Sequence, residues 1–152
     1  MHKLYHGDCL EIMLTLEDKS IDMILADLPY GKTHCDFDIL IPLKSLWKEY
    51  KRIIKDDGVI ALTAIQPFAS LLIMNDLKMF RYDLVWDKIN MYTGALNANR
   101  MPLRRHEHVL IFYKKLPTYN KQYRKGKPFK RVNTKGHGEH TQYGRINKKD
   151  IQ

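Results

Sequence analysis

A short apolar run that ends on an aspartate is the feature that most constrains this chain. Residues 21–26, Ile-Asp-Met-Ile-Leu-Ala, have the length and composition of a buried strand in a parallel sheet. Asp27, followed by Leu28, Pro29 and Tyr30, stands where that strand would end. Ligands of open α/β sheets bind beside the carboxyl ends of the strands. The sequence therefore predicts a candidate site at Asp27.

Hydrophobic periodicity predicts alternating strands and helices in the first 115 residues. Strands are expected at residues 2–6, 20–26, 59–65, 80–88 and 107–115, and helices at 9–16, 42–54 and 67–77. Asp8 is expected to cap the first helix, and residues 56–58, Asp-Asp-Gly, to end the second. Residues 89–103 have the composition of a loop. This order predicts a doubly wound α/β sheet with right-handed crossovers.

Charge is distributed unevenly along the chain. Residues 1–113 carry 14 Lys and Arg against 15 Asp and Glu, whereas residues 114–152 carry 12 against two. Aromatic side chains and glycines alternate with the cations of this second segment, which suits contact with a phosphate backbone. We expect nucleic-acid contacts from Lys121, Arg124, Lys125, Lys127, Lys130 and Arg131. The alternative is a solvated basic tail that binds polyanions without specificity.

Composition limits the class of protein. An apolar content of 44% is enough for the core of one domain. No run approaches the roughly 20 apolar residues that span a bilayer, and the first residues lack an apolar signal stretch. We therefore expect a cytoplasmic protein with no membrane partner. Cys9 and Cys35 are expected to be free thiols, and no metal site is expected from the spacing of the histidines, cysteines and acids.

Four stretches of the chain resemble bacterial and phage DNA amino-methyltransferases. These are LYHGDCLEIM, LEDKSIDMILADLPYG, YKRIIKDDGVIAL and YDLVWDK, in the order that the family has them. The family transfers a methyl group from S-adenosylmethionine to the exocyclic amine of adenine or cytosine. Its hallmark, Asp/Asn/Ser-Pro-Pro-aromatic, stands here as Asp27-Leu28-Pro29-Tyr30, with leucine in place of the commoner proline.

The resemblance covers residues 3–115 and, more loosely, the basic segment. It implies a partial Rossmann-like methyltransferase sheet, mostly parallel with an antiparallel edge strand, in residues 1–115. Residues 116–152 would then form a basic, loop-rich segment for target recognition on double-stranded DNA. The subgroup that the chain resembles has the catalytic motif first and serves DNA methylation in restriction-modification systems.

The resemblance also implies a role for each residue of the tetrapeptide. Asp27 and the backbone carbonyl of Leu28 would accept hydrogen bonds from the target amine, which aims the nitrogen lone pair at the methyl group. Pro29 would hold that carbonyl in place, and Tyr30 would stack on a base flipped out of the duplex. Aspartate at the first position favours adenine N6. The structural alternative is an ordinary turn at the end of a strand.

The cofactor site is implied only in part. Asp8, with Cys9 and Leu10 beside it, matches the family's acidic residue near the adenine of the cofactor, and Asp27 would border the same molecule. Asp8 could instead serve only as a helix cap. The family's glycine-rich loop, Phe-x-Gly-x-Gly after an apolar strand, does not occur in the 152 residues. We therefore expect an incomplete enzyme, inactive alone, that self-associates or needs a complementing C-terminal segment.

Two further points concern nucleic acid. Lys88 is expected to meet a phosphate and Arg100 to reach DNA from its loop, whereas Trp86 is expected in the core more than against a base. The competing function is a nucleic-acid-binding or interaction subunit without catalysis. Some relatives with similar motifs methylate RNA or protein glutamine, and aspartate rather than asparagine at position 27 argues against the glutamine enzymes.

Overall fold

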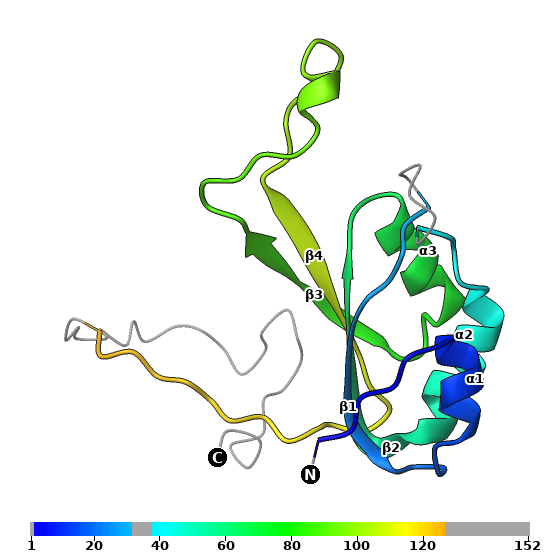
Figure 1. Cartoon of the computed structure of the whole chain (residues 1–152). Helices are drawn as coiled ribbons and strands as arrows, with labels where there is room; N and C mark the ends of the chain where they lie inside the picture. The colour runs from blue at the N-terminus through cyan, green and yellow to red at the C-terminus, as the bar shows by residue number, and fades with distance from the viewer. Residues whose placement is uncertain (1, 32–37, 127–152) are drawn as a thin grey trace. The chain divides into compact units, whose positions relative to one another are not determined.

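The computed structural model describes residues 2–31 and 38–126. The chain divides into two units, Met1–Tyr119 and Asn120–Gln152. All helices and strands of the described residues belong to the first unit (Figure 1): α1 (Cys9–Leu14), β1 (Ile21–Asp27), α2 (Leu43–Ile53), β2 (Ile54–Ala64), α3 (Phe68–Asn75), β3 (Phe80–Asp87), the short 3-10 helix η1 (Ala95–Asn97) and β4 (His106–Phe112).

The four strands form one mixed sheet in the order β1-β2-β4-β3. β1 pairs with β2 in parallel, and β4 pairs antiparallel with both of its neighbours. The expected sheet, mostly parallel with an antiparallel strand at its edge, is therefore wrong in two respects. Only one of the three pairings is parallel, and the reversed strand lies inside the sheet. The reason is that β3 returns through a hairpin, so that β4 pairs back on β3 and also against β2.

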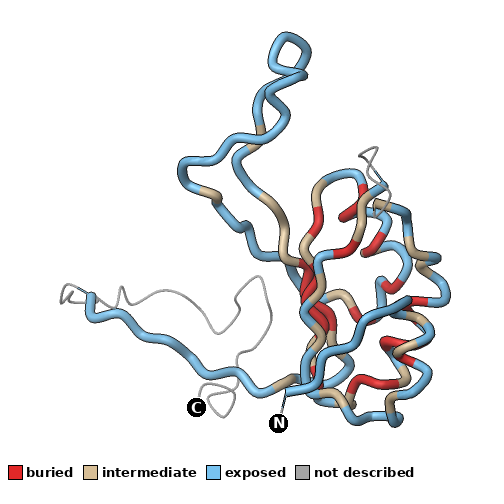
Figure 2. Tube along the Cα trace, viewed as in Figure 1, coloured by how far each residue is buried: buried red, intermediate tan, exposed pale blue. Residues whose placement is uncertain are grey.

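Helices α1, α2 and α3 all lie on one face of the sheet (Figure 1), so the described residues do not show the doubly wound arrangement that was expected. The buried side chains gather between this face and the helices (Figure 2). Those that are most fully enclosed are Leu46, Ile54, Ile60, Leu62, Leu72, Leu110 and Phe112. The other face keeps large apolar side chains exposed, namely Met23, Leu25, Tyr82, Leu84 and Trp86.

Two element boundaries differ from those expected. Residues 2–6 form no strand, and Leu4 is 99% exposed, so nothing in the described chain gives this apolar side chain a packing partner. Residues 56–58 lie inside β2 rather than at the end of a helix, because β2 starts at Ile54 directly after α2. Strand pairing begins there with Ile21 opposite Ile54, and the ion pair of Lys55 with Asp22 at 2.6 Å supports it.

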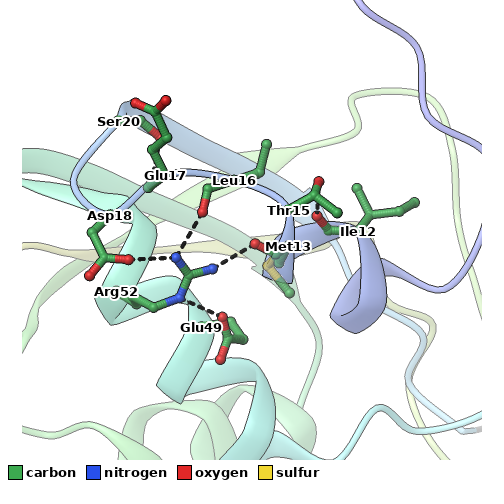
Figure 3. Close-up of polar contacts among 9 residues, drawn as sticks. All are labelled: Ile12, Met13, Thr15, Leu16, Glu17, Asp18, Ser20, Glu49 and Arg52. Carbon is green, nitrogen blue, oxygen red and sulfur yellow. Dashed lines mark hydrogen bonds and ion pairs between the residues drawn. The ribbon is translucent and has the colours of Figure 1, made fainter.

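Arg52 in the last turn of α2 fixes α1 and the approach to β1 (Figure 3). Its guanidinium donates to the backbone carbonyls of Met13 at 2.6 Å and Leu16 at 2.8 Å. It also pairs with Asp18 at 2.6 Å and with the buried carboxylate of Glu49 at 2.8 Å. Both orphan carbonyls at the end of α1 are thus satisfied. The contacts set the direction in which the chain enters β1, and β1 in turn places Asp27.

Candidate active site

Asp27 is the last residue of β1, and its side chain is exposed at the carboxyl end of the strand. Thr63 of β2 lies directly opposite in the parallel register. The Thr63 hydroxyl donates a hydrogen bond of 2.5 Å to Oδ1 of Asp27, and the Tyr30 hydroxyl donates one of 2.8 Å to the same oxygen. Within the described chain, Oδ2 has no partner. The carboxylate is therefore held by one oxygen and presents the other as a free acceptor.

Leu28 explains how the loop does without the commoner proline. Its side chain is 7% exposed and belongs to the hydrophobic core beneath the helices. No hydrogen bond to its carbonyl comes from residues 2–31 or 38–126. Pro29, half-buried behind it, restricts Leu28 to extended backbone geometry. Core packing thus anchors this position, while its carbonyl remains available as a second acceptor near Asp27.

The ring of Tyr30 is half-buried and packs against Phe68, with 5.4 Å between ring centroids and a tilt of 41°. Burial raises the pKa of Tyr30 to about 12, the nearby carboxylates of Asp27 and Glu107 add to this, and the hydrogen bond to Thr63 opposes it. The hydroxyl is therefore protonated at neutral pH and can donate to Asp27. Stacking of a flipped base on Tyr30 stays a prediction.

The titration of Tyr30 gives a pH-dependent prediction. A group buried in its neutral form stabilises the fold below its unfolded pKa, and this contribution disappears as the pH rises through the folded pKa. The free energy of unfolding should therefore fall between about pH 10 and pH 12. In spectrophotometric titration, Tyr30→Phe should remove a phenolate component near pH 12, and Thr63→Val should move that component higher. Loss of a component near pH 10 in Tyr30→Phe would contradict the environment described here.

Asp8 lies at the start of α1 and caps it. Its Oδ1 accepts a hydrogen bond of 2.7 Å from the backbone N–H of Leu10. Partial burial and the charge of Asp8 raise the pKa of the neighbouring Cys9 thiol. Among the described residues no hydrogen bond links Asp8 with Asp27. The cap is thus observed, and a role of Asp8, Cys9 and Leu10 toward a cofactor stays a prediction.

S-adenosylmethionine fits the described residues only in part. Asp8 retains a carboxylate oxygen for an adenine amine, and Asp27 marks the reacting end of such a site. A molecule of this size and polarity also needs a backbone cradle, and glycines supply one because chain and ligand can approach closely. Gly58, the glycine inside a described strand, is instead enclosed, since an added Cβ would lie 2.9 Å from the Asp22 carbonyl. Residues 2–31 and 38–126 therefore supply one side of a cofactor site.

A second group of side chains lies at the end of β3. Lys88 forms an ion pair with Glu107 and places its ammonium 5.1 Å from the centre of the Trp86 ring. Trp86 is 51% exposed, so its expected place in the core is wrong. It lies on the sheet face that no described helix covers. A pocket of about 460 Å³ opens here, lined by Trp86, Asp87, Lys88, Ile89 and Met91.

The strand directions bring these two places to one edge of the sheet. β1, β2 and β3 run the same way, so Asp27, Ala64 and Asp87 end their strands on the same side. Thr63 was missed by sequence reasoning, although its place next to the end of a predicted strand was a usable signal. Glu107 was also missed, because only the hairpin pairing of β3 with β4 brings it near Tyr30.

The expected DNA contacts are spread over both units. Arg100 is exposed in the hairpin between β3 and β4. Lys121, Arg124 and Lys125 are exposed in the second unit, while Lys127, Lys130 and Arg131 lie outside the described residues, as does Cys35. No helix in residues 2–31 and 38–126 is long and apolar enough to cross a bilayer.

Solved structures with the same arrangement of elements include DNA-modifying enzymes. M1.HpyAVI in complex with SAM is 19% identical, and the match covers 80% of this chain and 62% of that one with a TM-score of 0.57. For TTHA0409 of Thermus thermophilus, described as a DNA modification methylase and complexed with S-adenosyl-L-methionine, the values are 19%, 81%, 57% and 0.57. For the cytosine-N4-specific PvuII DNA methyltransferase they are 18%, 74%, 49% and 0.53.

The chain has the fold of DNA modification methyltransferases. The resemblance predicted from residues 3–115 is thereby confirmed at the level of the fold. The chain spans less than two thirds of the length of each of these three proteins. No protein-family model and no curated protein matches it.

Proposed function

We propose that this chain carries the catalytic segment of an S-adenosylmethionine-dependent DNA methyltransferase that acts on the exocyclic amine of a flipped base, most of all N6 of adenine. The observation that carries the proposal is the set of acceptors at the end of β1. Oδ1 of Asp27 is fixed by Tyr30 and Thr63, whereas Oδ2 and the carbonyl of Leu28 have no described partner. The shared fold supports the same class of enzyme.

These acceptors suit an exocyclic amine. Its nitrogen is a weak nucleophile because the lone pair is delocalised into the ring of the base. Hydrogen bonds from both amine hydrogens to Oδ2 and to the Leu28 carbonyl would favour a tetrahedral nitrogen with a localised lone pair. The acceptors are positioned before the base arrives, so little reorganisation accompanies the reaction. S-adenosylmethionine, when bound, supplies an electrophilic methyl group.

The proposal includes a completing segment. The described residues provide one side of a cofactor site, and we propose that a glycine-rich loop from outside this sequence provides the other. That loop could follow on the same polypeptide or belong to a separate chain. The completed enzyme would act on double-stranded DNA in the cytoplasm as part of a restriction-modification system, with the basic second unit contributing to target binding.

A second candidate function is a DNA-binding subunit without catalysis. The absence of a glycine-rich loop from the 152 residues favours it. The two functions differ in how the cofactor affects DNA binding. A methyltransferase binds duplex DNA more tightly with S-adenosylmethionine when both ligands share one site, and a binding subunit does not.

Fluorescence anisotropy with a labelled duplex distinguishes them, in the presence and absence of S-adenosylmethionine. The chain is compared with a longer chain that includes the coding sequence that follows it. We expect cofactor-enhanced DNA binding by the longer chain, and cofactor binding by the same chain in calorimetry. DNA affinity that the cofactor never alters, together with no heat of cofactor binding, would favour the binding subunit and overturn the proposed enzyme.

A further inference from the structure

The hairpin that joins β3 to β4 projects from the sheet beyond Asp87 (Figure 1, green and yellow-green). We call residues 89–105 the arm. It contains three arginines and no acidic residue. Almost its whole length is exposed, in contrast to the buried strands that carry it (Figure 2). A projection of this composition needs an explanation, because it contributes little to the core.

The base of the arm is braced on both sides. Arg105 makes two contacts with the Asp87 carboxylate, from Nε at 2.9 Å and from a terminal nitrogen at 2.7 Å. Lys88 pairs with Glu107, and its backbone N–H donates to the carbonyl of Arg105 at 2.9 Å. A two-point contact between guanidinium and carboxylate fixes orientation as well as distance. The arm therefore leaves the sheet in a defined direction.

The tip of the arm is also ordered by its own backbone. Thr93 and Arg104 exchange hydrogen bonds of 2.8 and 3.1 Å and close the loop. Gly94, with φ at +91°, then turns the chain into η1. The carbonyl of Asn97 accepts from the backbone N–H groups of Arg100 at 2.8 Å and Met101 at 3.0 Å. The tip is thus a compact turn on a braced stalk.

The side chains at the tip combine two properties. Leu96 is fully exposed, at 101%, and Tyr92 and Met101 are more than half exposed. Arg100 and Arg104 have no acidic partner among the described residues. Exposed apolar side chains beside unpaired arginines fit DNA, because proteins that bend or open duplexes insert apolar wedges between base steps while cations neutralise the phosphates.

The arm also lies at the edge of the sheet that carries the candidate site. β3 runs in the same direction as β1, so the arm departs on the side where Asp27 ends β1. Glu107, at the base of the arm, is close enough to Tyr30 for its charge to raise the pKa of that hydroxyl. A duplex that presents a base to Asp27 would pass beside the arm.

We propose that the arm binds duplex DNA next to the target base, with Arg100 and Arg104 on phosphates and Leu96 wedged between neighbouring base pairs. The inference rests on the proposed function and adds to it the device that helps to open the stack. It assigns the DNA contact to residues 96–104 of the hairpin, a part of the chain separate from the basic second unit.

The phosphate contacts are tested with the full chain by anisotropy over a range of salt concentrations. Each phosphate contact contributes about 0.9 to the slope of log affinity against log salt. We expect the double variant Arg100→Ala/Arg104→Ala to reduce that slope by roughly 1.8. The control, Lys44→Ala/Lys48→Ala, removes the same charge from exposed positions on α2 and should leave the slope closer to that of the unchanged protein. Equal slopes for the two double variants would overturn the proposal.

The wedge is tested by the fluorescence of 2-aminopurine placed in the duplex, which rises when the base unstacks. Leu96→Ala should lose most of the rise given by the unchanged chain, while Leu77→Ala, exposed after α3, should keep it. An equal rise in both variants would exclude the wedge. If the chain binds DNA and neither arm variant changes either signal, the arm serves another partner, such as a protein. If the unchanged chain binds no DNA at all, the proposed function fails as well.

Discussion

Asp27→Asn is expected to reduce methyl transfer by roughly a hundred- to a thousandfold, the range found when one preorganised polar group is lost from an active site. Asparagine keeps the shape of the side chain and removes its charge, so that one of two oxygens becomes a nitrogen that cannot accept. The hydrogen bonds of Tyr30 and Thr63 hold one oxygen of the carboxylate. In the variant the amide nitrogen would then face the amine.

The control for this variant is Asp22→Asn in the same strand. Asp22 is exposed at the opposite end of β1, where it pairs with Lys55. Its variant should methylate DNA like the unchanged enzyme, and both variants should bind DNA with unchanged affinity. Methyl transfer is measured with the longer chain and radiolabelled S-adenosylmethionine. Full activity in Asp27→Asn would remove Asp27 from the reaction.

Phe112→Ala is expected to lower the free energy of unfolding by about 3–5 kcal/mol, as for other large aromatic side chains deleted from a core. Phe112 is completely buried in β4, the strand inside the sheet. Its ring meets Trp47 of α2 with 4.8 Å between centroids and Phe80 of β3 with 5.5 Å. The substitution would leave a cavity between a helix and two strands that cannot close without moving all three.

Urea denaturation measures this effect, with Leu116→Ala as the control. Leu116 lies four residues beyond Phe112 and is 76% exposed, so its loss should change stability by less than about 0.5 kcal/mol. A loss for Phe112→Ala that is no larger than that of the control would contradict the place of β4 inside the sheet. An unchanged dependence on urea would show that the variant still unfolds as one unit.

The elements and the candidate site were predictable to different degrees. Periodicity located the helices and strands between residues 9 and 112 because each element presents one apolar side to a common core. It could not locate β4 within the sheet, since strand order depends on pairing between distant segments. Residues 56–58 look like a turn, yet the parallel pairing with β1 extends β2 through them.

Local sequence was most informative where a residue acts through its own backbone. Asp27 at the end of a strand and Asp8 before a helix follow from patterns a few residues long, and the structure places both as expected. The partners of Asp27 did not follow in the same way. Thr63 arrives through the register of β2, and the exposure of Trp86 follows from a sheet covered by described helices on one face.

The central claim is that this chain supplies the acceptors for methyl transfer to an exocyclic amine of DNA. The most direct test incubates duplex DNA with the longer chain and isotopically labelled S-adenosylmethionine, then digests the DNA and identifies the methylated nucleoside by mass spectrometry. We predict labelled N6-methyladenine, and none with Asp27→Asn. Label on N4 of cytosine would keep the reaction and correct the base. DNA without label, from a preparation that binds both DNA and cofactor, would contradict the claim.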